Sequence, residues 1–138
     1  MDHLWSPWRL EYVSGGGKQR RESAGCVFCL PVDDASRDPL ILYRGALAYV
    51  VLNLYPYNNG HLLIVPYRHE PSLAGLTREE LAEVGLLLQR AERALQEGYP
   101  PDGINVGVNL GRTAGAGVAA HVHVHVVPRW DGDTSFMT

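Results

Sequence analysis

Three histidines alternate with valines near the C-terminal end of the chain, in the segment His121-Val122-His123-Val124-His125-Val126. Successive side chains of a β-strand point to opposite faces. A strand here would place the imidazoles on one face, about 6 to 7 Å apart, and the valines in the core. Because imidazole titrates near neutral pH, one ring can act as a nucleophile while its neighbours donate protons. The segment predicts a catalytic row, against the alternatives of a solvated strand face or a row of metal ligands.

A loop rich in glycine and alanine leads into this row, from Asn109 to Gly117. Glycines let backbone N–H groups approach an anion closely, and Arg112 can add positive charge. Such loops are also common as plain turns. Beside a row of histidines, the loop predicts a phosphate cradle in which Gly115 and Gly117 contact a nucleotide.

The two cysteines, Cys26 and Cys29, have the spacing that lets both thiolates reach one metal ion. A structural disulfide is not expected in a chain that is read as cytoplasmic. The pair supplies only half of a zinc site, so a redox pair and two inert thiols remain alternatives.

Composition limits the classes of partner. The chain has 138 residues, 46% of them apolar, and a formal net charge of −3, which fits a single domain over residues 1–138 and argues against long nucleic acid as the partner. The segment Met1–Tyr12 lacks the pattern of a signal peptide. The longest apolar run, Ala46–Leu52, is too short to span a membrane, so we expect a cytoplasmic protein that does not bind membranes.

Strands and one helix must position these residues. Alternating and apolar runs predict strands at 40–43, 46–53, 61–65, 104–110 and 121–127, with turn residues at 56–60 closing a hairpin. Thr77 and Glu80 form a capping box, and apolar residues recur at helical spacing from Leu81 to Leu95, so a helix is expected to run through to Gly98. The pattern indicates an α+β domain with a mostly antiparallel sheet.

The N-terminal residues divide into two parts. Residues 1–13 carry Trp5, Trp8 and Tyr12 and are predicted to be an aromatic arm that packs on the domain or on a partner subunit. Residues 14–25 are predicted to form a flexible polar loop.

The run from His121 to Val127 resembles the His-φ-His-φ-His-φ-φ signature of the histidine-triad superfamily, where φ is apolar. The resemblance extends to the residues 5–9, 26–29 and 60–66, to Asn53 and Asn109, and to 128–130. The tail 128–137 is similar to that of the bacterial branch that handles diadenosine tetraphosphate as phosphorylases or hydrolases.

This resemblance implies a HIT-like fold with one long helix and a short one, a two-fold homodimer, and a nucleotidyl-histidine intermediate. It implies that His123 is the nucleophile, with one ring nitrogen held by a backbone carbonyl. It also implies that His125 hydrogen-bonds the α-phosphate or the bridging oxygen, and that His121 supports the site or binds metal.

Other residues gain roles from the same resemblance. Asn53 is expected to contact the ribose and Asn109 the phosphate or leaving group, although each could instead satisfy local backbone. Many relatives carry Gln where this chain has Gly117, so a phosphate contact there must come from backbone N–H groups. Zinc-containing relatives imply that His69 and His121 complete a structural zinc site with Cys26 and Cys29.

The expected function is the cleavage of dinucleoside polyphosphates, with an adenine nucleotide as substrate. Inorganic phosphate as the acceptor would make a phosphorylase, which is favoured, and water would make a hydrolase. The alternatives are an adenosine 5′-phosphoramidase and a nucleotide-binding module without turnover.

Overall fold

The computed structural model describes residues 26–29, 40–53, 56 and 58–134. The predicted aromatic arm at 1–13 and the predicted flexible loop at 14–25 lie outside the described residues. The described elements are, in chain order, β1 (Ile41–Arg44), β2 (Ala48–Leu52), β3 (Leu62–Pro66), η2 (Leu73–Gly75), α3 (Arg78–Gly98), β4 (Gly103–Gly107), η3 (Arg112–Ala114) and β5 (Val124–Arg129).

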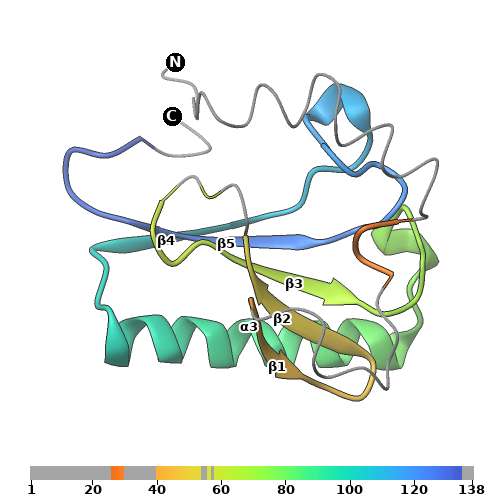
Figure 1. Ribbon diagram of the computed structural model, residues 1–138, viewed down its shortest axis with the longest axis horizontal. Helices are drawn as coiled ribbons and strands as arrows, with labels where there is room; N and C mark the ends of the chain where they lie inside the picture. The colour runs from red at the N-terminus through yellow and green to blue at the C-terminus, as the bar shows by residue number, and fades with distance from the viewer. Residues whose placement is uncertain (1–25, 30–39, 54–55, 57, 135–138) are drawn as a thin grey trace.

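The strands form one sheet in the order β1-β2-β3-β5-β4, and every neighbouring pair is antiparallel (Figure 1). This confirms the predicted α+β class. The predicted hairpin is β2–β3, with Ala48 opposite Pro66 and Leu52 opposite Leu62. Its turn ends at Gly60, whose φ of +85° is a conformation that side chains with a Cβ rarely adopt.

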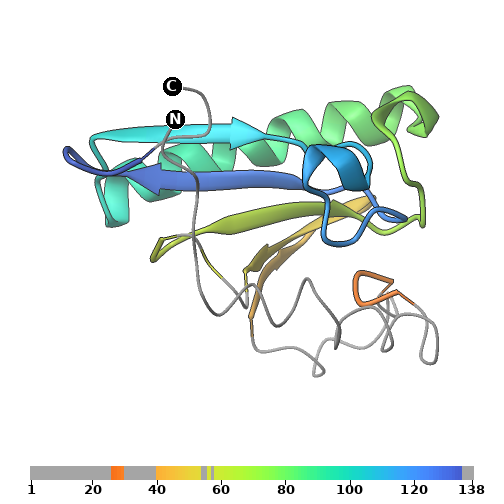
Figure 2. The same cartoon turned by 90° about the horizontal axis from the view of Figure 1, so that it is seen from above.

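Helix α3 covers one face of the sheet (Figure 2). It begins after Thr77, whose side chain accepts from the Glu80 N–H while the Glu80 carboxylate accepts from the Thr77 N–H, as the capping box predicts. Its apolar stripe packs with alternate residues of β2, β3 and β5 into one core cluster. The stripe does not begin at Leu81, which is 45% exposed, because the preceding Glu80 turns inward instead.

The opposite face of the sheet carries a second apolar cluster, built from Tyr49, Val51, Leu63 and Val65. Phe28 packs against this cluster, and the hydroxyl of Tyr49 donates to the Phe28 carbonyl at 2.9 Å. Figure 2 shows the Cys26–Cys29 segment on this side, away from α3. The candidate site is therefore assembled on the face that the helix leaves uncovered.

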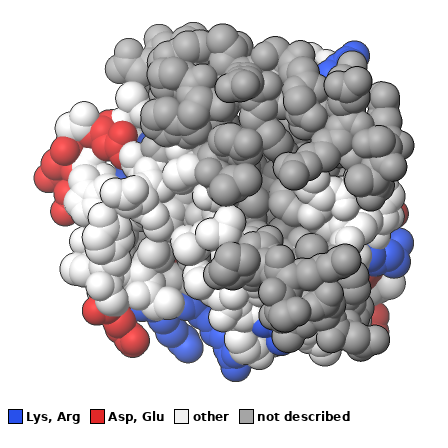
Figure 3. Space-filling model, in the orientation of Figure 1, with Lys and Arg blue, Asp and Glu red and all other residues white. Residues whose placement is uncertain are grey.

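Charged side chains in the view of Figure 3 lie in separate groups, with acidic residues at the left edge and basic residues along the lower edge. The described part of this face has no continuous basic surface. Among the described residues, none of the helices combines the length and apolar character needed to cross a membrane.

Candidate active site and metal centre

The histidine row, residues 121–125, enters β5 from a segment outside the sheet. The predicted strand start at His121 is wrong, because β5 begins at Val124. Before that point the N–H of Val122 donates to the carbonyl of Glu70 at 2.7 Å instead of joining the ladder. An extended segment can keep alternating histidines and valines without pairing to a neighbouring strand. The sequence pattern alone therefore did not locate the start of β5.

Within β5 the predicted alternation of faces holds. Val124 and Val126 belong to the core cluster beneath α3, whereas His125 lies opposite Leu63, a member of the cluster on the other face. All three histidines of the row are buried. The ring centroids of His123 and His125 are 5.0 Å apart, which is closer than the expected spacing of about 6 to 7 Å for alternate residues of a strand.

The ring of His123 is held by backbone, as the resemblance implied. Its Nδ1 lies 2.9 Å from the carbonyl oxygen of His121. A carbonyl can only accept a hydrogen bond, so the ring proton lies on Nδ1 and Nε2 carries a lone pair. Phe28 packs on the same imidazole, with 4.8 Å between the ring centroids. His123 is thus restrained in both position and tautomer.

His125 is oriented by another histidine, His61, which immediately precedes β3. The Nε2 of His61 lies 2.9 Å from the Nδ1 of His125, and both rings are buried. The amide Nδ2 of Asn53 lies 3.3 Å from the Nδ1 of His61 and 3.5 Å from its Nε2. If the amide donates to the nearer nitrogen, Nδ1 of His61 accepts and its Nε2–H donates to His125. The proton of His125 then lies on its Nε2, where it can be donated.

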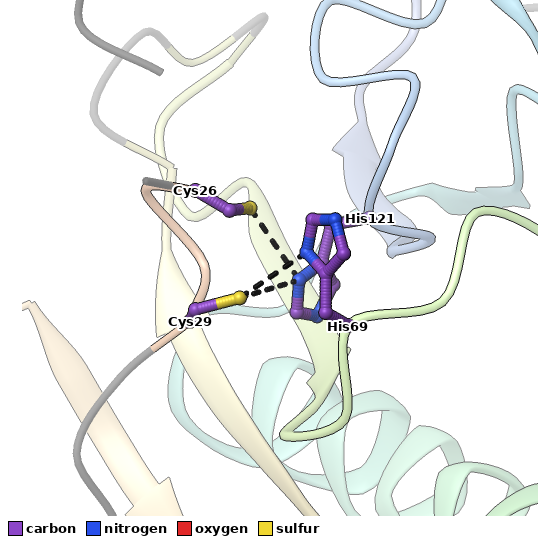
Figure 4. A group of neighbouring side chains, drawn as sticks. All are labelled: Cys26, Cys29, His69 and His121. Atoms are coloured by element: carbon purple, nitrogen blue, oxygen red, sulfur yellow. Dashed lines mark hydrogen bonds between the residues drawn. The ribbon is translucent and has the colours of Figure 1, made fainter. Parts of the chain in front are cut away.

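The two cysteines and two histidines converge in the structure (Figure 4). The Sγ of Cys26 lies 3.4 Å from the Nδ1 of His121, the Sγ of Cys29 lies 3.2 Å from the Nδ1 of His69, and the four ligand atoms all lie within 4.8 Å of one another. Tetrahedral zinc with ordinary bond lengths separates a sulfur and a nitrogen ligand by about 3.5 Å. The cluster has the dimensions of a Cys₂His₂ zinc site.

The protonation states of His121 and Cys29 bear on metal binding at this cluster. The Nε2 of His121 lies 2.7 Å from the carbonyl oxygen of Pro66, so the ring proton is on Nε2 and Nδ1 is free to coordinate. Burial lowers the pKa of His121, which keeps the ring neutral near pH 7. Burial, followed by the neighbouring Cys26, raises the pKa of the Cys29 thiol to about 11, so a metal would have to displace that proton.

The residues predicted to contact nucleotide lie in two places. Asn53 directly follows β2 and contacts His61 as described above. Asn109 and Gly115 come together in the loop before the histidine row, since a Cβ on Gly115 would lie 3.7 Å from the Asn109 amide nitrogen. Gly115 has φ of +98°. Gly117 lies further along this loop, which contains η3 and ends at the row.

Sequence reasoning did not assign His61 a role in the site. The residue stands alone before an apolar strand, and a single histidine at such a place has no informative spacing. Its partner His125 is brought to it because β3 and β5 are neighbours in the sheet, with Leu62 opposite Val126. The sequence did contain one clue to this role. His61 lies between the hairpin turn and its second strand, and a chain with a histidine row gives such a residue a possible partner.

A family model described as the HIT domain matches residues 36–132. The chain is similar to the "AP-4-A phosphorylase" of Mycobacterium tuberculosis, with 42% identity over 142 residues that cover 100% of this chain and 73% of that protein. It is also similar to the "Bis(5'-adenosyl)-triphosphatase" of Dictyostelium discoideum, with 36% identity over 93 residues, 67% of this chain and 62% of that protein.

Among solved structures, the fold resembles a zinc-bound histidine triad family protein from Mycobacterium smegmatis. The TM-score is 0.69 and the sequence identity is 34%, and the match covers 80% of each chain.

Proposed function

The chain belongs to the HIT domain family, and on that premise we propose that it is an enzyme that cleaves dinucleoside polyphosphates, with diadenosine tetraphosphate as the favoured substrate. The relatives at 42% and 36% identity carry the names of a phosphorylase and a hydrolase of such dinucleotides. The reaction class is therefore supported from two separate relatives.

The observations that carry the proposal are the contact of His123 with the His121 carbonyl and the contact of His125 with His61, from which we infer complementary tautomers. His123 has its proton on the nitrogen that faces the His121 carbonyl, which leaves Nε2 as the nucleophile. His125 has its proton on the nitrogen that faces away from His61, which makes it the donor. One attacking ring and one donating ring, with centroids 5.0 Å apart, are what transfer of a nucleotidyl group needs.

In the first step, Nε2 of His123 attacks the α-phosphorus of the bound nucleotide. A phosphorus–nitrogen bond forms and the bond to the bridging oxygen breaks, while His125 donates a proton to that oxygen as charge develops on it. In the second step, water or inorganic phosphate attacks the same phosphorus and gives its proton to His125. The bond to His123 breaks, and AMP or ADP leaves.

Substrate contacts are proposed for Asn53 at the ribose and for Asn109 at the phosphate or leaving group. Gly115 and Gly117 would contribute backbone N–H groups to the phosphates, and the left-handed conformation of Gly115 suits such a turn. We favour inorganic phosphate as the acceptor, because the relative at 42% identity is named a phosphorylase. Diadenosine tetraphosphate then yields ADP and ATP.

We further propose that the cluster of four ligands, Cys26, Cys29, His69 and His121, binds a structural zinc ion. Four protein ligands leave no open position for water, so the metal would supply rigidity and no chemistry. Because His121 also holds His123 through its carbonyl, fixing His121 fixes the nucleophile. Zinc thiolates persist in reducing compartments, so we place the protein in the cytoplasm.

A two-fold homodimer is proposed as the assembly. Strand β4 stands at the edge of the sheet, and Val106 of this strand and Leu110 just beyond it are 53% and 44% exposed. Exposed edge strands with apolar side chains are commonly covered by another chain. Light scattering at micromolar concentration tests this, and replacing Val106 with lysine should shift a dimer toward the monomer.

Incubation with diadenosine tetraphosphate, with and without inorganic phosphate, tests the reaction. ADP and ATP that appear only when phosphate is present establish a phosphorylase, and AMP and ATP without phosphate establish a hydrolase. If neither set of products forms, the proposal fails, and adenosine 5′-phosphoramidate and simple nucleotide binding become the next assays.

A further inference from the structure

We infer that Arg68 and Glu80 form a positioning pair, which ties the segment after β3 to the start of α3 and thereby holds the histidine row. The inference deepens the proposed function, on which its activity readout rests. Neither residue is placed against the nucleotide, and neither belongs to the metal cluster. Both would act through the segment from Tyr67 to Leu76, called here the linking segment.

The linking segment and the residue before it contact the histidine row at three points. The carbonyl of Pro66 accepts from Nε2 of His121 at 2.7 Å. The carbonyl of Glu70 accepts from the N–H of Val122 at 2.7 Å. The ring of His69 meets the ring of His121 edge to face, with centroids 5.3 Å apart. The position of His121 and Val122 therefore depends on where the linking segment lies.

The other side of the linking segment is tied to α3 by Arg68. Its Nη2 donates to Oε1 of Glu80 at 2.8 Å, and its Nε lies 3.2 Å and 3.3 Å from the two carboxylate oxygens. Nη2 also donates to the carbonyl of Gly75, and Nη1 to Oε2 of Glu70 at 3.4 Å. The guanidinium of Arg68 thus connects Glu70 and Gly75 of the linking segment with Glu80 of α3. A planar group with several donors is suited to this role.

The position of Glu80 is fixed by its hydrogen bonds with Thr77 at the start of α3. Its Oε1 accepts from the N–H of Thr77 at 2.8 Å, and its own N–H donates to the Thr77 hydroxyl at 3.1 Å. The side chain is 7% exposed, whereas that of Arg68 is 46% exposed. A carboxylate buried at a helix N-terminus is held in one place, so the residue that binds it is held as well.

The neighbouring acidic residue Glu83 provides a matched comparison. Its carboxylate accepts from the N–H groups of Ala46 and Leu47, so it ties the same helix to a different turn, between β1 and β2. That turn meets the linking segment at Tyr67, whose N–H donates to the Leu47 carbonyl and whose hydroxyl donates to the Gly45 carbonyl, each at 3.0 Å. Glu83→Gln therefore weakens a contact of the same kind between α3 and a turn, further from the residues that contact the histidine row, which are Pro66, His69 and Glu70.

The experiment compares Arg68→Gln, Glu80→Gln, their double variant and Glu83→Gln with the wild type. Glutamine at position 80 can keep the capping box, since its side-chain oxygen still accepts from Thr77. The first readout is amide hydrogen exchange at Val122, measured by NMR relative to Ile64 in the core. The second is the rate at which a chelator removes zinc, and the third is kcat on the dinucleotide.

We expect faster exchange at Val122 and about 10-fold faster zinc release in Arg68→Gln and Glu80→Gln, as outer-shell residues of metal sites typically produce. The double variant should be no worse than the stronger single one, because the two residues act through one contact. Glu83→Gln should change both rates less than either single variant, and kcat should fall most in the variants of Arg68 and Glu80.

Wild-type exchange at Val122 in folded Arg68→Gln and Glu80→Gln would overturn the inference, as would equal acceleration in Glu83→Gln. A wild-type protein without dinucleotide turnover would instead defeat the proposed function. The exchange measurement needs neither turnover nor zinc, so it decides the role of the pair in either case.

Discussion

The Nε2 atom of His61 lies 2.9 Å from the Nδ1 atom of His125, although the two residues are 64 positions apart in the chain. In the proposed reaction, this contact gives His125 a tautomer opposite to that of His123. His123 presents a lone pair on Nε2 because its Nδ1–H donates to the His121 carbonyl, and His125 presents a proton on Nε2 because its Nδ1 accepts from His61. The fold sets the tautomers before any substrate arrives.

Replacement of His61 should therefore impair turnover without removing any group that touches phosphorus. We expect His61→Leu, which has no donor, to lower kcat about 100-fold, at the low end of what a positioned proton donor contributes. His61→Gln keeps an amide donor and should lose less. Steady-state kinetics with zinc content as a check on folding measures both variants, and equal loss in the two would argue that His61 only fills space.

Substitution of Asn53 tests the proposed tautomer of His61 directly. A carboxylate can only accept, so Asn53→Asp should draw the proton of His61 to Nδ1 and make its Nε2 an acceptor. His125 would then donate to His61 and lose its proton toward the substrate. We expect a lower kcat than in Asn53→Ala, as read from full Michaelis–Menten curves. A residue that only binds ribose would raise KM in both variants with kcat unchanged.

The sequence was informative wherever a pattern is local. The capping box of Thr77 and Glu80 located the start of α3, and the turn residues before Gly60 located the hairpin. The histidine row was recognised by its spacing. The partners of that row were harder to find, because the contact of His61 with His125 depends on the order of strands in the sheet.

The course of the chain at Val122 and the burial of Glu80 could not be predicted from the sequence, because each depends on a contact with a distant residue. The alternation from His121 onward says that the segment is extended, but not that Val122 bonds to Glu70 and joins no strand. Helical spacing includes Leu81 as readily as Glu80, and the contacts of Glu80 with Arg68 and Thr77 explain why the acidic residue is the buried one. Both details involve contacts with the linking segment, whose course no local pattern predicted.

His123→Ala should abolish turnover, because alanine has no ring nitrogen to replace the proposed nucleophile, Nε2 of His123. Nucleotide affinity should stay close to that of the wild type, since the proposed contacts to ribose and phosphates remain. Product analysis and calorimetry with a non-hydrolysable dinucleotide measure the two effects. Residual turnover above about one part in a hundred would be incompatible with His123 as the nucleophile.

Zinc content provides a test independent of nucleotides. Protein purified without chelator should contain about one zinc ion per chain, and Cys26→Ser and Cys29→Ser should each lose most of it. Because His121 is a proposed ligand, the metal-free protein should also lose activity and thermal stability, and both should return when zinc is added. Metal analysis that finds no zinc in the wild type would leave the convergence of the four ligands without a function.

The stability of the protein at acid pH should report the contact of Glu80 with Arg68. The Arg68 hydrogen bond is the main reason why the pKa of Glu80 is lowered, so this carboxylate is more acidic in the folded than in the unfolded chain. Its contribution to the free energy of unfolding is then complete above the unfolded pKa of about 4.3, and it is lost as the pH falls through the folded value. Urea unfolding of metal-free protein should give a stability difference between the wild type and Glu80→Gln that is constant near neutral pH.

That difference should shrink as the pH falls below about 4.3, because the protonated carboxyl of the wild type then resembles the neutral amide. Glu83→Gln serves as the control, since Arg68 donates to Glu80, whereas the Glu83 carboxylate accepts from the N–H groups of Ala46 and Leu47. A difference for Glu80→Gln that stays the same down to the lowest pH at which the protein folds would contradict the ion pair. The Glu80 side chain would then stabilise the helix start through the hydrogen bond that it accepts from the Thr77 N–H, which a neutral carboxyl or amide oxygen can also accept.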